Sequence, residues 1–225
     1  VLPRNPSLRQ AAPIGRLRFV ARDCLSGLHM TRVGDALTFF RAWLADPHFV
    51  GAVAPSSQGL ARLMTSELSA SDGPVLELGP GTGVFTDALI KAGVPEPALT
   101  LVELNEEFAR LLSIRYPQAK VLRTDARHLV REREQCGEKY AAVISGLPLL
   151  ALSNGCVLRI LTQAFALSRA DGVLYQFTYG WRCPVPNAIL QRLDLRADRI
   201  GTVFTNIPPA SVYRIVRNDR ARRLC

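Results

Sequence analysis

Five short apolar runs, each followed by a polar or glycine-bearing turn, dominate the middle of this chain. They predict strands at Val75–Leu78, Leu99–Glu103, Val121–Thr124, Tyr140–Ser145 and Val173–Tyr179. None of them alternates polar and apolar residues along its whole length, which is typical of strands that are covered on both faces. Apolar residues at helical spacing predict helices near Val84–Lys91, Glu106–Arg115 and Val157–Leu167. Strands and helices therefore alternate, which predicts a parallel sheet with helices on both faces.

Two further apolar runs close the pattern, at Ile200–Phe204 and Ser211–Val216. The connection between them is too short for a parallel crossover, which needs a dozen or more residues, so the pair must be antiparallel. The predicted fold is α/β: a doubly wound, Rossmann-like sheet of seven mostly parallel strands.

The N-terminal part follows a different pattern. Residues Val33–Leu44 carry an apolar stripe at helical spacing, which predicts an amphipathic helix, and a second helix is expected to begin with Ser56 or Ser57 as its cap. We divide the chain into a basic N-terminal extension, 1–48, and a catalytic domain, 49–225.

The stripe has two interpretations that periodicity does not separate. Its aromatic residues either pack against the edge of the sheet or lie in a membrane interface, with flanking arginines toward anionic head groups. The residues of the membrane interpretation are Phe39, Phe40 and Trp43, with Arg32 and Arg41. The location of charge favours the membrane.

Net charge is concentrated at the two ends of the chain. Residues 1–45 hold seven arginines and two aspartates, and residues 214–225 hold five arginines and one aspartate, whereas the middle is balanced. Basic ends suit an anionic partner, either a nucleic acid or an acidic lipid surface. No apolar run approaches the ~20 residues that cross a bilayer.

Cysteine and histidine are sparse and scattered. The five cysteines form no Cys-x-x-Cys pair, and the three histidines lie far apart. We therefore expect reduced thiols in a cytoplasmic protein and no metal site.

The strongest chemical signal is the segment from Glu77 to Gly83, which joins the first strand to its helix. It reads Glu-Leu-Gly-Pro-Gly-Thr-Gly, with glycines at positions 79, 81 and 83. Alternate glycines remove side chains from a strand-to-helix turn, so that a ligand can lie against backbone N–H groups. A dinucleotide loop spaces its glycines Gly-x-Gly-x-x-Gly, so this loop is a variant of that motif.

Acidic residues follow the next two strands, at the edge where an α/β sheet binds its ligand. Glu103, about twenty residues after the loop, is placed to accept hydrogen bonds from two ribose hydroxyls. Asp125 can accept from an adenine amino group, or cap the helix that begins near Ala126, or do both.

The glycine loop and its acids resemble the S-adenosylmethionine (SAM) site of class I methyltransferases. Four further segments extend the resemblance to the bacterial phospholipid N-methyltransferases: Gly51–Ser57, Ser145–Leu150, Gln176–Tyr179 and Asn206–Ala210. The resemblance covers roughly Leu37 to Tyr213. It implies stepwise methylation of the amine of phosphatidylethanolamine, giving phosphatidylcholine, with SAM as donor and S-adenosylhomocysteine as product. It further implies a cytoplasmic enzyme attached peripherally to the inner face of the cell membrane.

Site residues follow from this resemblance together with their places after the strands. The expected cofactor-binding residues are Pro55, Ser56, Ser57, Glu77, Gly79, Gly81, Thr82, Gly83, Glu103, Leu104, Asp125, Ala126 and Ser145. Ser145 and Tyr179 are the catalytic candidates, and Tyr179, Arg182 and Tyr213 are the substrate-binding candidates. Arg182 can bind the lipid phosphate or be a solvated loop residue, and Tyr213 can be a buried structural tyrosine.

Two other functions remain as alternatives. The first is an adenine N6-dimethyltransferase of ribosomal RNA, which carries Asn-x-Pro-aromatic after the fourth strand. Here Leu149 stands at the aromatic position, and a flipped base would lose ~1–3 kcal/mol of stacking there. The second is a membrane-binding protein with an idle methyltransferase fold, but the acids at 77, 103 and 125 are all intact. We expect a lipid substrate and no nucleic-acid partner.

Overall fold

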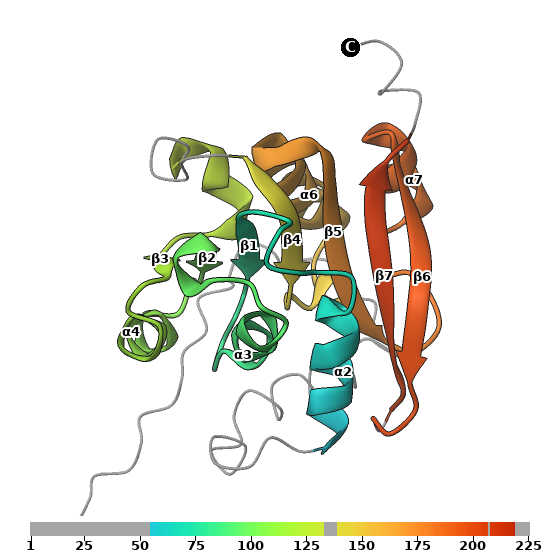
Figure 1. The fold of residues 1–225 in the computed structure, drawn as a ribbon. Helices are drawn as coiled ribbons and strands as arrows, with labels where there is room; N and C mark the ends of the chain where they lie inside the picture. Colours follow the sequence, from blue (N-terminus) through green and yellow to red (C-terminus); the bar gives the residue numbers. More distant parts are fainter. Residues whose placement is uncertain (1–54, 133–138, 207, 219–225) are drawn as a thin grey trace, which may run out of the picture.

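The computed structural model describes residues 55–132, 139–206 and 208–218. They form a seven-stranded sheet in the order β3-β2-β1-β4-β5-β7-β6, which runs across Figure 1 from β3 to β6. Five strands pair in parallel, and β7 (Ala210–Arg217) is antiparallel to both of its neighbours. The doubly wound, mostly parallel sheet expected from the sequence is confirmed.

The strands are short at one side of the sheet and long at the other. Their bounds are β1 Val75–Leu78, β2 Leu99–Val102, β3 Lys120–Leu122, β4 Tyr140–Ser145, β5 Ser168–Tyr179 and β6 Leu195–Val203. The helices are α2 Pro55–Thr65, α3 Val84–Lys91, α4 Glu106–Arg115, α6 Asn154–Leu167 and α7 Asn187–Arg192, with short 3₁₀ turns at Glu96–Ala98 (η2), Ala126–Glu132 (η3) and Leu149–Ala151 (η4).

The sheet separates two apolar cores. One core packs residues of α2, α3 and α4 against one face of the sheet, and the other packs η3, α6 and α7 against the opposite face. Within a strand, consecutive residues alternate between the two cores; Val143 belongs to the second core and Ile144 to the first. Both faces are therefore covered, as the continuous apolar runs predicted.

Several boundaries differ from the expectation. The α2 helix already begins at Pro55, so neither serine is its cap; proline suits the first helical position because its missing N–H needs no partner there. The η3 segment is a 3₁₀ helix, and β5 begins five residues early, with a register shift against β4. The six-residue α7 was not expected from the sequence.

The expectation of reduced thiols is wrong at Cys156, which is disulfide-bonded, because sequence spacing does not show which cysteines meet in space.

The predicted amphipathic helix at Val33–Leu44, its membrane residues and the 1–48 extension lie outside the described residues, as does most of the basic C-terminal end. In the part of the chain that the structure describes, no helix combines the length and apolarity needed to cross a membrane.

Candidate functional site

The candidate site lies at the carboxyl ends of the parallel strands. The chain order reverses direction at β1, which has β2 on one side and β4 on the other. At such a switch point the loops leave in opposite directions and open a crevice for a ligand. The residues that follow β1, β2, β3, β4 and β5 therefore meet along one edge of the sheet.

The glycine loop is held in a conformation that side chains disfavour. Gly79, Gly81 and Gly83 have φ values of 67°, 56° and 87°, in the left-handed region that only glycine adopts readily. A Cβ at Gly83 would lie 2.6 Å from the hydroxyl of Tyr116. The third glycine, one residue earlier than in a dinucleotide loop, is the N-cap of α3 and leaves no room for a side chain.

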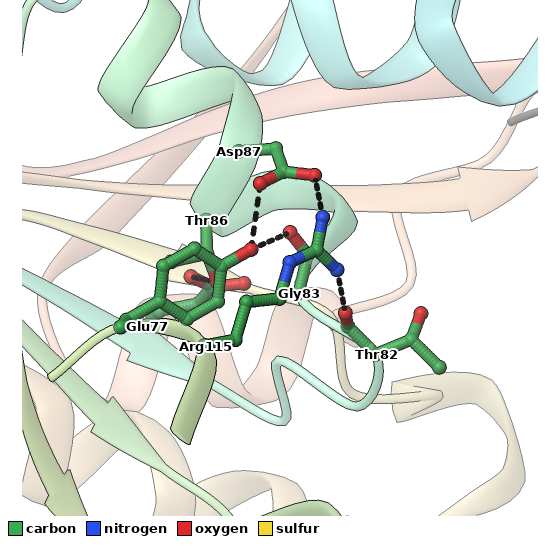
Figure 2. Close-up of polar contacts among 7 residues, drawn as sticks. Glu77, Thr82, Gly83, Thr86, Asp87 and Arg115 are labelled. Atoms are coloured by element: carbon green, nitrogen blue, oxygen red, sulfur yellow. Dashed lines mark hydrogen bonds and ion pairs between the residues drawn. The ribbon is translucent and has the colours of Figure 1, made fainter. Parts of the chain in front are cut away.

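A set of polar contacts fixes this loop from the side of α4. The hydroxyl of Tyr116 shares its one proton between the carbonyl of Gly83, at 3.1 Å, and Asp87, at 2.7 Å. Arg115 pairs with the same aspartate and donates to the carbonyl of Thr82 at 2.8 Å (Figure 2). The loop is therefore braced by residues about thirty positions away, which no local sequence signal indicated.

We expect Tyr116→Phe to weaken cofactor binding several-fold while preserving the fold. The change removes one hydroxyl that hydrogen-bonds both the loop and Asp87, worth about 1 kcal/mol or more. Calorimetric titration with S-adenosylhomocysteine measures the effect. Tyr140→Phe, at an equally buried tyrosine in the other core, is the matched control, and an equal loss in both variants would contradict a role for the brace.

Glu77 is fully buried at the centre of β1, on the α3 side of the sheet. One carboxyl oxygen accepts a hydrogen bond from the Thr86 hydroxyl at 2.7 Å, and Oε1 has no partner among the described residues (Figure 2). Desolvation by burial raises the pKa of Glu77 from 4.5 to about 8, against the lowering effect of the Thr86 hydrogen bond. In the absence of a ligand, this carboxyl group is therefore mostly protonated at neutral pH.

The raised pKa of Glu77 predicts a pH-dependent stability. Between pH 4.5 and about 8 the folded chain holds a proton on Glu77 that the unfolded chain has lost, so stability falls as pH rises through this window. The slope from this one group approaches 1.4 kcal/mol per pH unit. Denaturant unfolding of Glu77→Gln and of the unchanged protein at pH 5.5 and 7.5 tests this. Between pH 5.5 and 7.5 the glutamine variant should lose less stability than the unchanged protein. Equal losses would contradict the raised pKa of Glu77.

Glu103 is the first residue after β2, and it is buried. One of its oxygens accepts from the N–H of Gly81 at 3.1 Å and the other accepts from the N–H of Asn105 at 2.8 Å. The Glu103 carboxylate thus contacts the glycine loop and lies where this loop meets the end of β2. This is the group predicted to accept hydrogen bonds from a ribose. Leu104, predicted beside it, is exposed.

Asp125 follows β3 and contacts the start of η3. It accepts from the backbone N–H of Arg127 at 2.8 Å and forms an ion pair with the same residue's guanidinium at 2.6 Å. Burial alone would raise the pKa of Asp125, but the hydrogen bonds and charge of Arg127 outweigh it and hold the pKa below its ordinary value. Asp125 therefore caps the start of η3. The remaining lone pairs of its carboxylate can still accept a hydrogen bond from a ligand.

Ser145, the last residue of β4, belongs to a polar row that crosses the sheet. In register it lies beside Gln176 of β5, and Gln176 lies beside Tyr213 of β7. Because side chains of one row point to the same face, all three lie on the α6 and α7 side. The Tyr213 hydroxyl donates to the carbonyl of Trp181 at 2.5 Å, which leaves its oxygen as an acceptor only.

Tyr179 ends β5 on the opposite face, where its ring lies edge-on to Phe177 with a centroid distance of 5.7 Å. Burial raises the pKa of its hydroxyl, so it is neutral at physiological pH. Arg182 follows as an exposed residue of the β5–α7 loop. The two catalytic candidates therefore lie on different faces of the sheet, near the same carboxyl edge.

Five buried polar atoms at this edge have no hydrogen-bond partner among the described residues. They are Glu77 Oε1, Ser145 Oγ, Gln176 Oε1, Thr178 Oγ1 and Asn206 Oδ1. Burying such an atom without a partner is unfavourable, and in native proteins it commonly marks a ligand or water site. Sequence reasoning missed Gln176, Thr178 and Asn206 as site residues, although all three lie in segments that carried the family resemblance.

The loops after β1 and β4 approach each other more closely than side chains permit. A Cβ on Gly146 would lie 2.7 Å from the carbonyl oxygen of Gly79. Conversely, a Cβ on Gly79 would lie 2.7 Å from a methyl group of Leu147. The two loops therefore pack backbone against backbone across the switch point.

Pro55, Ser56 and Ser57 form the first turn of α2, which packs against α3 and the ends of β6 and β7. Among the residues that the structure describes, no group of three or more His, Cys, Asp or Glu side chains is placed to hold a metal ion.

Two curated proteins match this chain, and no protein-family model does. An ornithine lipid N-methyltransferase of Singulisphaera acidiphila is 30% identical over 176 residues, covering 73% of this chain and 86% of that protein. A ribosomal RNA small subunit methyltransferase A of Maridesulfovibrio salexigens is 38% identical over 68 residues, covering 30% of this chain and 25% of that protein.

Solved structures of methyltransferases share the fold. The N-methyltransferase NodS of Bradyrhizobium japonicum, with bound S-adenosylhomocysteine, matches with a TM-score of 0.58 and 14% identity, over 80% of this chain and 96% of that one. Magnesium protoporphyrin IX methyltransferase of Synechocystis, with bound SAM, matches with a TM-score of 0.56 and 16% identity, over 81% and 93%.

Proposed function

The chain belongs to the class I SAM-dependent N-methyltransferases, the family of the ornithine lipid N-methyltransferase of Singulisphaera acidiphila, and we propose that it methylates the amine of a membrane lipid head group. The observation that carries this proposal is the similarity to that lipid enzyme over nearly its whole length. Phosphatidylethanolamine, methylated stepwise to phosphatidylcholine, is the substrate that the sequence motifs favour. An ornithine lipid, with the same kind of primary amine, is the second candidate that the relative's name favours.

The cofactor is SAM, and the residues at the carboxyl edge fit its parts. Backbone N–H groups of the glycine loop would face the methionine carboxylate, and the unpartnered oxygen of Glu77 would accept from its ammonium group. Glu103 would accept from the ribose hydroxyls. Asp125 and Ala126 would contact the adenine, with Leu104 covering its ring, and the first turn of α2 would enclose the ligand.

SAM supplies a methyl group on a positively charged sulfur. Bound at this edge, it would offer that methyl group to a neutral head-group nitrogen lying in line with the carbon–sulfur bond. The protein's main task is therefore to hold the nitrogen in line and close. In our proposal the amine of the head group donates hydrogen bonds to Ser145 Oγ and Gln176 Oε1. Both are buried oxygens that have no partner among the described residues.

The amine must lose its proton before it attacks. Segment 145–150 contains no histidine and no carboxylate, so we propose that desolvation at this buried edge lowers the pKa of the ammonium. The neutral ring of Tyr179 can receive the methylated cation on its face. Arg182, exposed in the loop after the same strand, would bind the lipid phosphate. The proposed location is the inner face of the cell membrane, peripherally attached.

The geometry after β4 supports a lipid over a nucleic-acid base. Leu149, at the position where the RNA enzymes carry an aromatic ring, is 3% exposed and belongs to the apolar core. It offers neither a π-face nor an open surface for stacking. The RNA methyltransferase relative matches less than a third of this chain, in contrast to the lipid enzyme.

One assay tests the proposal. Purified protein and labelled SAM are incubated in parallel with vesicles containing phosphatidylethanolamine, with vesicles containing an ornithine lipid, and with small-subunit ribosomal RNA. We expect label in the lipid and none in the RNA. Label in the RNA alone would overturn the proposal, and label in only one of the two lipids would identify the head group.

A further inference from the structure

The carboxyl edge of the sheet exposes large apolar side chains that the fold itself does not use. Among the described residues, six large hydrophobic side chains are exposed, and four of them follow strands at this edge. They are Leu104 after β2, Leu150 after β4, Trp181 after β5 and Phe204 after β6. The strand ends that carry them all belong to the edge with the candidate site (Figure 1).

Trp181 and Phe204 form one exposed aromatic pair, the aromatic lip. Their rings have a centroid distance of 5.7 Å although they belong to two different loops. The side chains are 56% and 68% exposed. In the same β5–α7 loop Val185 is 1% exposed, and in the same hairpin loop Asn206 is buried. Each loop thus buries a smaller or polar residue and leaves its large aromatic outside, the reverse of what folding favours.

Hydrogen bonds fix the backbone that carries Trp181. The Trp181 carbonyl accepts from the Tyr213 hydroxyl at 2.5 Å, and the neighbouring Gly180 carbonyl accepts from the Ser211 hydroxyl at 2.6 Å. Gly180 also donates from its N–H to the carbonyl of Pro209 at 2.8 Å, which ties the two loops together. Pro184, Pro186, Pro208 and Pro209 further restrict both loops.

Charge around the lip is positive. The guanidinium of Arg199 lies 5.8 Å from the centroid of the Trp181 ring, and Arg182 is exposed beside it. The loop segments 180–186 and 203–209 contain no acidic residue. Tryptophan and phenylalanine flanked by arginines suit a membrane interface, where rings enter the head-group region and guanidinium groups face lipid phosphates.

We propose that the aromatic lip inserts into the head-group region of an anionic bilayer and sets the carboxyl edge of the sheet against the membrane. This membrane contact belongs to the folded domain and is separate from the predicted N-terminal helix. It deepens the proposed lipid function, since it brings the edge with Ser145 and Tyr179 to the level at which a lipid amine lies.

Fluorescence tests the insertion directly, because the chain has only two tryptophans, at 43 and 181. In the Trp43→Phe variant of this 225-residue chain, all tryptophan emission comes from Trp181. With vesicles of phosphatidylethanolamine and phosphatidylglycerol we expect a blue shift, and strong quenching when the acyl chains are brominated near the head group. Co-sedimentation with vesicles without any quenching would overturn the proposal. Emission already shielded from aqueous iodide before lipid is added would also overturn it, because the chain's own residues would then cover the lip.

A pair of variants measures how much the lip contributes. Trp181→Ala with Phe204→Ala should weaken vesicle partitioning about tenfold or more, with unchanged affinity for S-adenosylhomocysteine. The matched control is Ile114→Ser on α4, an apolar side chain that is 71% exposed but lies away from the carboxyl edge; its partitioning should not change. Equal losses in both variants, or none in either, would overturn the proposal.

Failure of the membrane-insertion proposal can be distinguished from failure of the proposed lipid methylation. If the unchanged protein inserts Trp181 but methylates no lipid, the function fails and the membrane surface stands. The opposite result is that the unchanged protein methylates lipid in vesicles, and the double alanine variant partitions and methylates equally well. In that case the membrane-insertion proposal fails and the lipid-methylation proposal stands.

Discussion

Glu103→Ala should abolish useful SAM binding and leave the fold intact. In the structure each oxygen of this carboxylate holds a backbone N–H, one of them in the glycine loop. The alanine variant loses that contact and the two proposed hydrogen bonds to the ribose. A hydrogen bond to a charged group contributes about 1.5–3 kcal/mol, so two of them predict a loss of roughly 100-fold or more in affinity.

Calorimetric titration with SAM and with S-adenosylhomocysteine measures this loss, and the melting temperature without ligand reports the fold. Glu103→Gln keeps the shape of the side chain and one acceptor oxygen. Its affinity for SAM should therefore lie between that of the alanine variant and that of the unchanged protein. Glu106→Ala, three residues on, is the matched control, because its carboxylate is exposed and pairs with Arg123 at 2.6 Å, away from the glycine loop. Undiminished affinity in Glu103→Ala would refute the ribose assignment.

Gly146→Ala should damage stability and cofactor binding together. The added Cβ would lie 2.7 Å from the Gly79 carbonyl oxygen and 3.5 Å from that of Leu78, and both of these atoms are backbone. Because backbone atoms in a sheet cannot turn aside as a side chain can, the two loops must move apart. Such overpacking costs typically 1–3 kcal/mol, and the displaced glycine loop should bind SAM at least tenfold more weakly.

Gly155→Ala is the matched control for this change. A Cβ there would meet no atom within 4 Å, and the residue lies in the first turn of α6, where alanine is the better helix former. Urea unfolding should therefore show a loss for Gly146→Ala and no loss for Gly155→Ala. If both variants unfold at the same urea concentration, the close packing at the switch point has no energetic role.

The parts of the fold that depend on local pattern were predictable. The α3 and α4 helices begin and end where the apolar spacing placed them, and the short terminal connection fixed the antiparallel β7. The six-residue α7 was missed because fewer than two helical turns give too few residues for a periodic signal. The start of α2 was misplaced because two serines looked like caps although proline precedes them.

The parts that depend on tertiary contacts were not predictable. Nothing in the sequence near the glycine loop indicates that Arg115 and Tyr116, 33 residues from their partners in the loop, would hold it. Likewise an apolar pattern predicts burial, so the exposure of Trp181 becomes visible only when the two loops around it are placed. The positions of the carboxylates and glycines after their strands were predictable, because a ligand site in an α/β sheet requires such residues at fixed places after the strands.

The five unpartnered polar atoms at the carboxyl edge have a consequence for the stability of the protein as a whole. Apolar side chains of similar shape would cost less to bury, so evolution for stability alone would replace them. Their presence implies a trade-off in which the ligand-free enzyme gives up stability to remain ready for its ligand. If SAM binds Glu77 as proposed, it would return part of that stability, and the fraction of folded enzyme should rise with the concentration of SAM.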